Sequence, residues 1–382
     1  MKRIMTIYGT RPEAIKMAPL VKALEAADKL EPVVAVTGQH REMLDEVNAL
    51  FGITPAHDLD LMRRGASLTE ITTSALTATS QLIERVAPDA VVVQGDTTSA
   101  FTGALASFYN QVPVVHLEAG LRTGNIYSPF PEEVNRRLTA PLSALHLAPT
   151  PTSRANLERE GIDPTTITVT GNTVIDALLT STSVHPAFRD PRVPQLLSAG
   201  GPILLVTTHR RESWGAPMEG TMAAVREVAE RHPEVQVLLP MHRNPTVRNV
   251  VEHVLGRQGN VLLTDPLSYH EFAHALKPAK VVLTDSGGVQ EEAPSLGKPV
   301  LVLRDTTERP EAVHAGTVRL VGTGRLAVRD AILELFEDGE AWARMSHAVN
   351  PYGDGHAAPR CVAAIEELFG LGRRLPDFIP AE

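Results

Sequence analysis

Three acidic residues in the N-terminal half have the type and position that acid–base chemistry requires. Asp96 and Glu118 each follow an apolar run typical of a buried strand, and Glu132 lies in the segment "SPFPEEVNRR". A carboxylate beside a buried strand is costly unless it has a partner or a function. Carboxylates crowded into one cleft have shifted pKa values and can act as acid and base on opposite faces of a substrate. The pattern favours proton-transfer chemistry.

Each of these acids also has a structural interpretation. Asp96 can cap a helix that begins at Thr97, and Glu118 can pair with Arg122 or Arg137. Taken singly, such an acid is more often structural than catalytic. Because three of them converge on one edge of a predicted sheet, the functional interpretation is favoured for the set.

A second candidate segment is "IYGTRPEAIKMAPL", residues 7–20, where a β-rich run stops at Gly9 and a helical run begins. Gly9 and Lys16 are spaced like the ends of a P-loop, but the second glycine and the Ser or Thr of that motif are missing. What remains is a tight turn, Pro12 near a helix start, and the cations Arg11 and Lys16. This arrangement suits an anion at a helix N-terminus without implying ATP.

The segment "TDSGGVQEEAPSLGKPVLVL" predicts a second anion site. A strand-like run ends just before Ser286, and Gly287 and Gly288 open a helix that contains Glu291 and Glu292. Backbone amides at a glycine-rich helix start can hold a diphosphate, and a carboxylate farther along can accept hydrogen bonds from ribose hydroxyls. The alternative is an ordinary helix cap followed by a solvated acidic face.

His209 in "VTTHRRES" ends the first predicted strand of the second half. A lone histidine at such a place is more often a satisfied core group. The neighbouring Arg210 and Arg211 favour an anion site, because a cationic imidazole can stabilise a departing phosphate.

Residues 270–274, His-Glu-Phe-Ala-His, match the zinc-protease motif literally. In those enzymes two histidines one helical turn apart bind zinc, and the glutamate is the general base. Here Pro266 and Pro278 bracket a short helix, and an apolar strand follows where a metalloprotease would continue as helix. We therefore expect no metal. No G-x-G-x-x-G motif stands at a strand–helix junction, so we also expect no dinucleotide and no other cofactor.

These residues must be positioned by alternating strands and helices. Short, continuous apolar runs predict strands buried on both faces, as in parallel sheets, and the helical segments between them supply the crossovers. We expect an α/β protein with two doubly wound domains, and ligands beyond the carboxyl ends of their strands, in one interdomain cleft. The expected domains are residues 1–172 and 173–355, with residues 356–382 packing back on the first and a Pro- and Gly-rich linker near residues 183–202.

The composition of the chain excludes several classes of protein. The chain of 382 residues is 43% apolar and 21% charged with a net charge of −9, which argues against nucleic-acid binding and against a basic membrane-surface protein. The single cysteine, Cys361, excludes internal disulfides, and no apolar run is long enough for a signal segment or a membrane span. The expectation is a cytoplasmic protein.

The motifs taken in order resemble one family. "GTRPEAIKMAPL", "TGQHREML", "QGDTTSA", "HLEAGLRTGNIYSPFPEEVNRR", "VTGNTVIDAL", "THRRES", "TDSGGVQEEAPSLGKPVLVLRDTTERPEAV" and "NPYGDGHAAPR" closely resemble segments of the bacterial non-hydrolysing UDP-N-acetylglucosamine 2-epimerases. The resemblance implies the GT-B fold, two Rossmann-like domains, and usually a homodimer. It also implies interconversion of UDP-N-acetylglucosamine and UDP-N-acetylmannosamine, which supplies a precursor of cell-envelope polysaccharide.

The resemblance implies a role for each candidate. The hydrogen on C2 is not acidic, so the family expels UDP from C1, removes the C2 proton to give a bound 2-acetamidoglucal, and then reverses both steps with protonation on the other face. The acid–base groups are then the three carboxylates, with neither face assigned to any one of them, and His209 meets the leaving diphosphate. The charge-neutralising cations are Arg11, Lys16 and Arg136, and the groups for phosphate and ribose are Ser286, Gly287 and Glu292.

Many bacterial members bind a second UDP-N-acetylglucosamine as an allosteric activator. Gln39 and His40 of "TGQHREML" match part of that site, whereas Glu42 stands where relatives carry an amide. Arg63 and Arg64 are a weaker match to the basic residue that some relatives use there. We therefore expect regulation by the substrate, although the sequence departs from the family pattern at Glu42.

Three rival functions stay open at this level. A GT-B glycosyltransferase would share the UDP site, but it would be expected to carry an apolar or basic acceptor surface where this chain has three acids. A hydrolysing epimerase, which releases free N-acetylmannosamine, is poorly separated by these residues alone. A non-catalytic UDP-sugar sensor would not need to retain the acids and His209.

Overall fold

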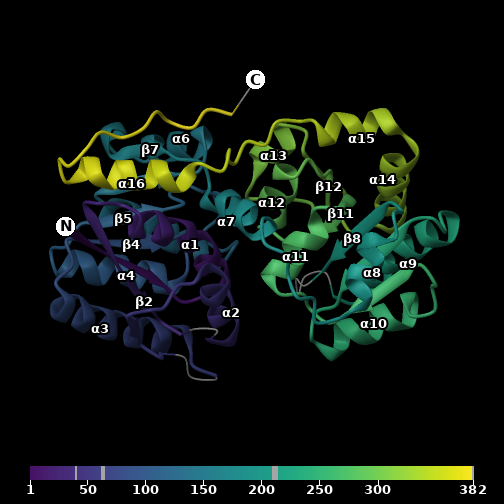
Figure 1. Cartoon of the computed structure of the whole chain (residues 1–382), viewed down its shortest axis with the longest axis horizontal. Helices are drawn as coiled ribbons and strands as arrows, with labels where there is room; N and C mark the ends of the chain where they lie inside the picture. The colour runs from purple at the N-terminus through teal and green to yellow at the C-terminus, as the bar shows by residue number, and fades with distance from the viewer. Residues whose placement is uncertain (39–40, 62–64, 209–213, 381–382) are drawn as a thin grey trace. The chain divides into compact units, whose positions relative to one another are not determined.

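The computed structural model describes residues 1–38, 41–61, 65–208 and 214–380. The chain divides into two compact units (Figure 1). Unit 1 comprises Met1–Ala177 and Tyr352–Pro380, and unit 2 comprises Leu178–Pro351. The chain therefore passes from one unit to the other twice. Within the described ranges, no helix is both long enough and apolar enough to cross a membrane.

Unit 1 is built on a seven-stranded sheet in the order β3-β2-β1-β4-β5-β6-β7, with every neighbouring pair parallel. The strand order reverses between β1 and β4, and this switch is where ligands of open α/β sheets bind. All five residues of β4 are buried, as its uninterrupted apolar sequence requires. The strands are β1 Lys2–Tyr8, β2 Leu30–Val36, β3 His57–Asp58, β4 Ala90–Gln94, β5 Val114–Leu117, β6 Leu145–Ala148 and β7 Ile167–Val169.

Helices of unit 1 flank this sheet, and several begin at residues that the sequence marks as caps. Thr10 caps α1 in a reciprocal arrangement with Glu13, and Thr97 caps α4. Helix α16 from the end of the chain packs against α1, while α3, α4 and α5 pack in succession (Figure 1). The helices are α1 Arg11–Glu25, α2 Arg41–Phe51, α3 Leu68–Val86, α4 Thr98–Tyr109, α5 Glu132–Thr139, η1 Ala140–Leu142, α6 Pro151–Arg159, η2 Pro164–Thr166, α7 Thr173–Thr182 and α16 Ala357–Leu368.

Unit 2 repeats the design with a six-stranded parallel sheet in the order β10-β9-β8-β11-β12-β13. Its strand order reverses between β8 and β11. The strands are β8 Ile203–Thr207, β9 Gln236–Pro240, β10 Val261–Thr264, β11 Ala279–Thr284, β12 Val300–Val302 and β13 Val318–Leu320. The helices are α8 Arg192–Ser198, α9 Ala216–Arg231, α10 Pro245–Leu255, α11 Tyr269–Leu276, α12 Val289–Ser295, α13 Pro310–His314, α14 Arg325–Glu337 and α15 Gly339–Ser346.

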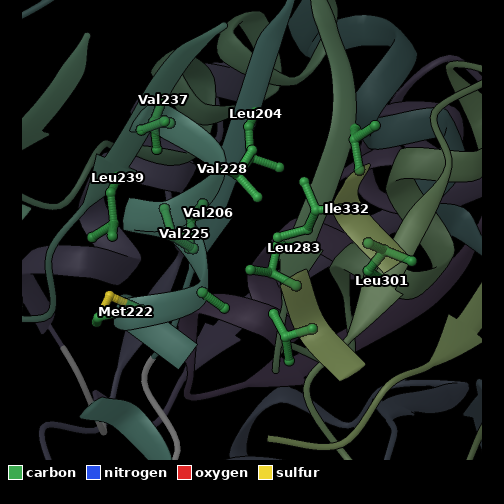
Figure 2. Packing of buried hydrophobic residues seen from close by; sticks show 14 of the residues in the cluster. Leu204, Val206, Met222, Val225, Val228, Val237, Leu239, Leu283, Leu301 and Ile332 are labelled. Carbon is green, nitrogen blue, oxygen red and sulfur yellow. The ribbon is translucent and has the colours of Figure 1, made fainter. Parts of the chain in front are cut away.

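Branched and aliphatic side chains of these elements form the core of unit 2. Val225 and Val228 of α9 lie against Leu204 and Val206 of β8, and Ile332 of α14 belongs to the same cluster (Figure 2). Burying one such side chain stabilises the fold by about 1.5–3 kcal/mol, so the core holds the strand ends in a fixed register.

The predicted class, two doubly wound parallel α/β halves, is confirmed. One local expectation needs correction, because the segment expected to be a linker contains the helix α8. The two-residue strand β3 was not predicted, since no apolar run marks it in the sequence. A strand this short is defined by its pairing with β2 rather than by its own sequence.

Candidate active site

Glu118 is the most enclosed of the predicted acid–base residues. It follows β5 with a φ of 64°, a left-handed conformation that non-glycine residues seldom adopt, and it is 8% exposed. Lys16 Nζ donates to its Oε1, Gln94 Nε2 donates to Oε2, and Asn172 Nδ2 donates to Oε1 at 3.2 Å. A group that accepts from several N–H donors behaves as an ionised carboxylate, which has only acceptor sites.

The turns after β1 and β4 are tied together beside this carboxylate. Gly9 ends β1 where no side chain fits, since a Cβ there would lie 2.0 Å from Thr37 Oγ1. The buried Glu13 accepts from the amides of Gly9 at 3.0 Å and Thr10 at 2.7 Å, and from Thr97 Oγ1 at 2.5 Å. Burial raises the pKa of Glu13 and outweighs these hydrogen bonds. This bracing fixes the first turns of α1, where Arg11 and Lys16 stand.

Asp96 follows β4 and is half-buried. Arg136 Nη2 lies 2.5 Å from its Oδ2, and Asn135 Nδ2 donates to its carbonyl oxygen at 2.9 Å. The helix cap of α4 is Thr97, so the interpretation of Asp96 as that cap is wrong. The pairing of Glu118 with Arg122 or Arg137 is also not found: Glu118 pairs with Lys16.

Two adjacent glutamates at the start of α5 have different surroundings. Glu132 is half-buried, whereas Glu133 is fully buried. Glu133 accepts from the amides of Thr123 at 3.0 Å and Gly124 at 3.2 Å, and it pairs with Arg136 at 3.3 Å. Burial raises the pKa of Glu133, but the two amides and the Arg136 charge outweigh it and hold that pKa below its usual range. Glu133 thus stabilises the loop that leads to Glu132.

Unit 1 therefore brings two charged sets to neighbouring strand ends, Glu118 with Lys16 and Asp96 with Arg136. Sequence reasoning did not single out Gln94, Asn172 or Glu133. For Gln94 and Asn172, a sequence signal was available, because each is a polar side chain at the end of an apolar strand, in "VVVQGD" and "TVTGN".

His116 on β5 is a buried core group of this half. Its Nε2 lies 2.7 Å from the carbonyl oxygen of Gly95, and burial lowers its pKa to about 3. The ring is therefore neutral at physiological pH and serves the backbone between β4 and β5.

In unit 2 the candidate residues lie in the turn after β11. The hydroxyls of Thr207 and Thr284 are 2.6 Å apart, and the amide of Ser286 donates to Thr284 Oγ1 at 2.9 Å. A side chain at Gly287 would have to displace its neighbours, since a Cβ there would lie 2.7 Å from Arg309 Nη1 and 3.1 Å from Glu308 Oε1. The turn is thus a tightly packed feature at the topological switch of this sheet.

The two glutamates of α12 are both buried, so the alternative of a solvated acidic face is wrong. Glu291 is a structural partner whose Oε1 lies 2.5 Å from Arg309 Nε. Glu292 is buried beside the phenol of Tyr269. The pKa of Tyr269 is raised well above its usual range, first by burial and then by the negative charge of Glu292.

The His-Glu-x-x-His segment forms α11, and both of its histidine rings contact backbone carbonyl oxygens. Nε2 of His270 lies 2.7 Å from the carbonyl oxygen of Val184, and Nε2 of His274 lies 3.2 Å from that of Ser181. Glu271 caps its own helix through the Ser268 amide. Across the part of the chain that the structure describes, no group of three or more His, Cys, Asp or Glu could hold a metal ion.

Unit 2 also contains a cavity of about 490 Å³ at the carboxyl ends of β9 and β10. This volume is within the usual range for small-molecule sites. Four arginines contribute to its lining: Arg189, Arg192, Arg243 and Arg248. Sequence reasoning did not predict it. Three predicted site residues, His209, Gln39 and His40, lie outside the described residues.

A sequence model of the family described as UDP-N-acetylglucosamine 2-epimerase matches residues 22–366. The chain belongs to this family. It is 51% identical over 369 residues to the UDP-N-acetylglucosamine 2-epimerase of Yersinia pestis, an alignment that covers 95% of this chain and 98% of that protein.

Solved structures agree with this membership. A UDP complex of S. aureus MnaA has a TM-score of 0.91 at 48% identity and covers 99% of this chain and 100% of that chain. The UDP-GlcNAc 2-epimerase from Neisseria meningitidis, bound to UDP-GlcNAc, has a TM-score of 0.87 at 44% identity, covering 96% and 100%. The predicted family, GT-B fold and enzyme class, an isomerase of the 2-epimerase type, are confirmed.

Proposed function

We propose that this epimerase interconverts UDP-N-acetylglucosamine and UDP-N-acetylmannosamine by elimination and re-addition of UDP. The observation that carries the proposal is the enclosed pair of Glu118 and Lys16 beside the pair of Asp96 and Arg136, at the strand ends where ligands of such sheets bind. A relative whose structure is known binds UDP-GlcNAc, which supports this choice of substrate.

In the forward elimination, the C1–O bond breaks and UDP leaves with the bonding electrons. The C2 proton passes to a carboxylate, and the electrons of the C–H bond form the C1–C2 double bond of 2-acetamidoglucal. The return delivers a proton to the other face of C2 while the diphosphate oxygen bonds again to C1. We assign Glu118 as a proton acceptor because it accepts hydrogen bonds as an ionised carboxylate does. Asp96 and Glu132 are the other acid–base groups of the proposal.

Anchoring of UDP is needed because a lost leaving group would end the reaction. We assign this work to Arg11, Ser286, Gly287 and Glu292, with His209 at the diphosphate. A buried Glu292 carboxylate suits ribose hydroxyls, since a desolvated acceptor gains more from such bonds than an exposed one. The enzyme would act in the cytosol, where its single buried cysteine stays reduced, and would supply precursors of cell-envelope polysaccharide.

The decisive experiment is proton NMR of the purified protein with UDP-N-acetylglucosamine in D₂O without added cofactor or metal. Appearance of UDP-N-acetylmannosamine with deuterium at C2 would support the proposal. Free N-acetylmannosamine and UDP as the stable products would instead identify a hydrolysing enzyme. No reaction, despite measured binding of UDP, would overturn the epimerase proposal in favour of a transferase or a sensor.

We also propose a homodimer formed through α3 and α4. Phe108 and Tyr109 at the end of α4 are 56% and 64% exposed, next to the Thr- and Ser-rich surface of α3. Exposed aromatic side chains of this kind are enriched at protein–protein interfaces and suit self-association. Sedimentation velocity should give a dimer for the wild type and a monomer for Phe108→Glu. Leu326→Glu, at a 60% exposed position of α14, is the control that should remain dimeric.

Allosteric activation by UDP-N-acetylglucosamine, through Gln39 and His40, is a further part of the proposal and rests on the resemblance. With UDP-N-acetylmannosamine as the only substrate, the reverse reaction should begin with a lag that a trace of UDP-N-acetylglucosamine removes. A His40→Ala variant that keeps the wild-type response to the added sugar would contradict the assignment.

A further inference from the structure

Asn172 contacts both the candidate acid–base site and the segments that connect the two units. It is 3% exposed and lies between β7 and α7, directly after Gly171, which has a φ of 81°. A Cβ on Gly171 would lie 3.4 Å from the Cα of Gly353, so the backbone approaches the returning chain closely at this point.

Among the hydrogen bonds of Asn172, three hold its side chain and its own amide in place. Its amide N–H donates to the carbonyl oxygen of Tyr352 at 2.7 Å, and its Oδ1 accepts from the amide of Val174 at 3.1 Å. Its Nδ2 donates to Glu118 Oε1 at 3.2 Å. Because Oδ1 is engaged by a backbone amide, the NH₂ group is the part of the side chain that faces the carboxylate.

The backbone groups of Val174 and Tyr352 that bond to Asn172 belong to the two places where the chain changes unit. Val174 opens α7, which runs past the change from unit 1 to unit 2 after Ala177, and Tyr352 is the first residue of the return to unit 1. A further pair of bonds joins the same segments, since Asp176 accepts from the amides of Ala357 at 3.2 Å and Ala358 at 2.9 Å. The contact to Glu118 is therefore attached to a braced part of unit 1 rather than to a free loop.

We propose that Asn172 is a positioning residue that orients the Glu118 carboxylate for proton transfer at C2, an inference that rests on the proposed role of Glu118. Proton abstraction requires one carboxylate oxygen to be aimed at the C–H bond. Lys16 and Asn172 both hold Oε1, while Gln94 holds Oε2. The asparagine fixes orientation without adding charge beside the base. A lysine alone, on a flexible stem, would not define the plane of the carboxylate.

The test compares two substitutions at this one position. Asn172→Asp keeps an acceptor for the Val174 amide, since aspartate is as good a helix cap as asparagine, but it sets a second carboxylate against Glu118. Two carboxylates at this distance raise each other's tendency to hold a proton, so the acidic limb of the kcat–pH profile should move about 1–3 pH units upward. At neutral pH, kcat should fall about tenfold or more, with the affinity for UDP unchanged. Asn172→Ala removes the donor without the repulsion, so its limb should move less.

A purely structural cap would behave differently. For such a cap, Asn172→Ala would lower the unfolding midpoint but leave kcat and the pH profile of the folded enzyme at their wild-type values, whereas a positioning residue predicts a lower kcat; wild-type kcat in Asn172→Ala would overturn the proposal. Asn244→Asp is the matched control, because it makes the same exchange at another helix N-cap, where Oδ1 accepts from the Thr246 amide at 2.9 Å. Its kcat and pH profile should be those of the wild type, and an equal upward shift there would also overturn the proposal.

A crystal structure of Asn172→Asp separates this inference from the proposed function. A Glu118 carboxylate turned away from position 172 supports positioning whether or not the wild type epimerises the sugar. A carboxylate that keeps its wild-type place beside Asp would overturn it. A wild type that shows no epimerisation would defeat only the proposed function, because the crystallographic result does not depend on turnover.

Discussion

The same substitution, Glu to Gln, should mainly lower stability at Glu133 and mainly lower activity at the adjacent Glu132. Glu133→Gln replaces a fully buried carboxylate by a neutral amide whose NH₂ group must face other donors. At least one of the Thr123 and Gly124 amides, now 3.0 and 3.2 Å from Glu133, then loses its acceptor, and Arg136 loses half of its countercharge. An unsatisfied buried donor costs about 1–3 kcal/mol, and weakening a buried ion pair adds to this.

We therefore expect Glu133→Gln to lower the free energy of unfolding by about 3 kcal/mol. For a unit of this size that corresponds to a Tm lower by about 6–12 °C, measured by circular dichroism or calorimetry. Glu132→Gln should lose less than half as much stability, yet it should abolish deuterium exchange at C2 while leaving UDP binding intact. Equal destabilisation by the two substitutions, or an unchanged Tm for Glu133→Gln, would refute the reasoning.

The pH dependence of this difference has a defined sign. The pKa of Glu133 in the folded protein lies below its ordinary value of 4.5, so its ionised form stabilises the fold above that pH. The stabilisation is lost as the pH falls through the folded-state value. The Tm difference between wild type and Glu133→Gln should be full at pH 7 and should shrink below about pH 4.5. A difference that grows on acidification would contradict the assignment of charge.

The remaining predictions concern the acid–base group, the turn after β11, and metal independence. Asp96→Asn should abolish turnover and spare UDP binding by calorimetry; surviving turnover would remove Asp96 from the acid–base set. Gly287→Ala should fold, because the flexible Arg309 guanidinium can yield, but it should weaken UDP binding about tenfold as the turn shifts; unchanged affinity would place the nucleotide elsewhere. Extensive treatment with EDTA should leave activity unchanged, and zinc added to His270→Ala and to wild type should act alike, since that histidine serves a carbonyl oxygen.

Local sequence determined the secondary structure and the layout of the two halves. Continuous apolar runs such as Ala90–Gln94 are stable only when buried on both faces, which requires helices over both sides of a parallel sheet. Helix starts were also readable, because side chains like Thr10 satisfy amides only three residues away. The candidate acids could be predicted for a related reason, since a carboxylate that ends an apolar strand must lie at the ligand-binding edge.

What the sequence could not decide is which of several similar residues meets which partner. Lys16, Gln94 and Asn172 reach Glu118 from separations of 102, 24 and 54 residues, and no local pattern encodes such distances. Glu132 and Glu133 look alike in the sequence, and only the loop at residues 123–124 makes the second one structural. The helix of His270 and His274 carries a metal motif, yet Nε2 of each histidine contacts a neighbouring backbone carbonyl oxygen. Sequence periodicity reports burial, whereas hydrogen-bond partners depend on which strand ends the tertiary fold brings side by side.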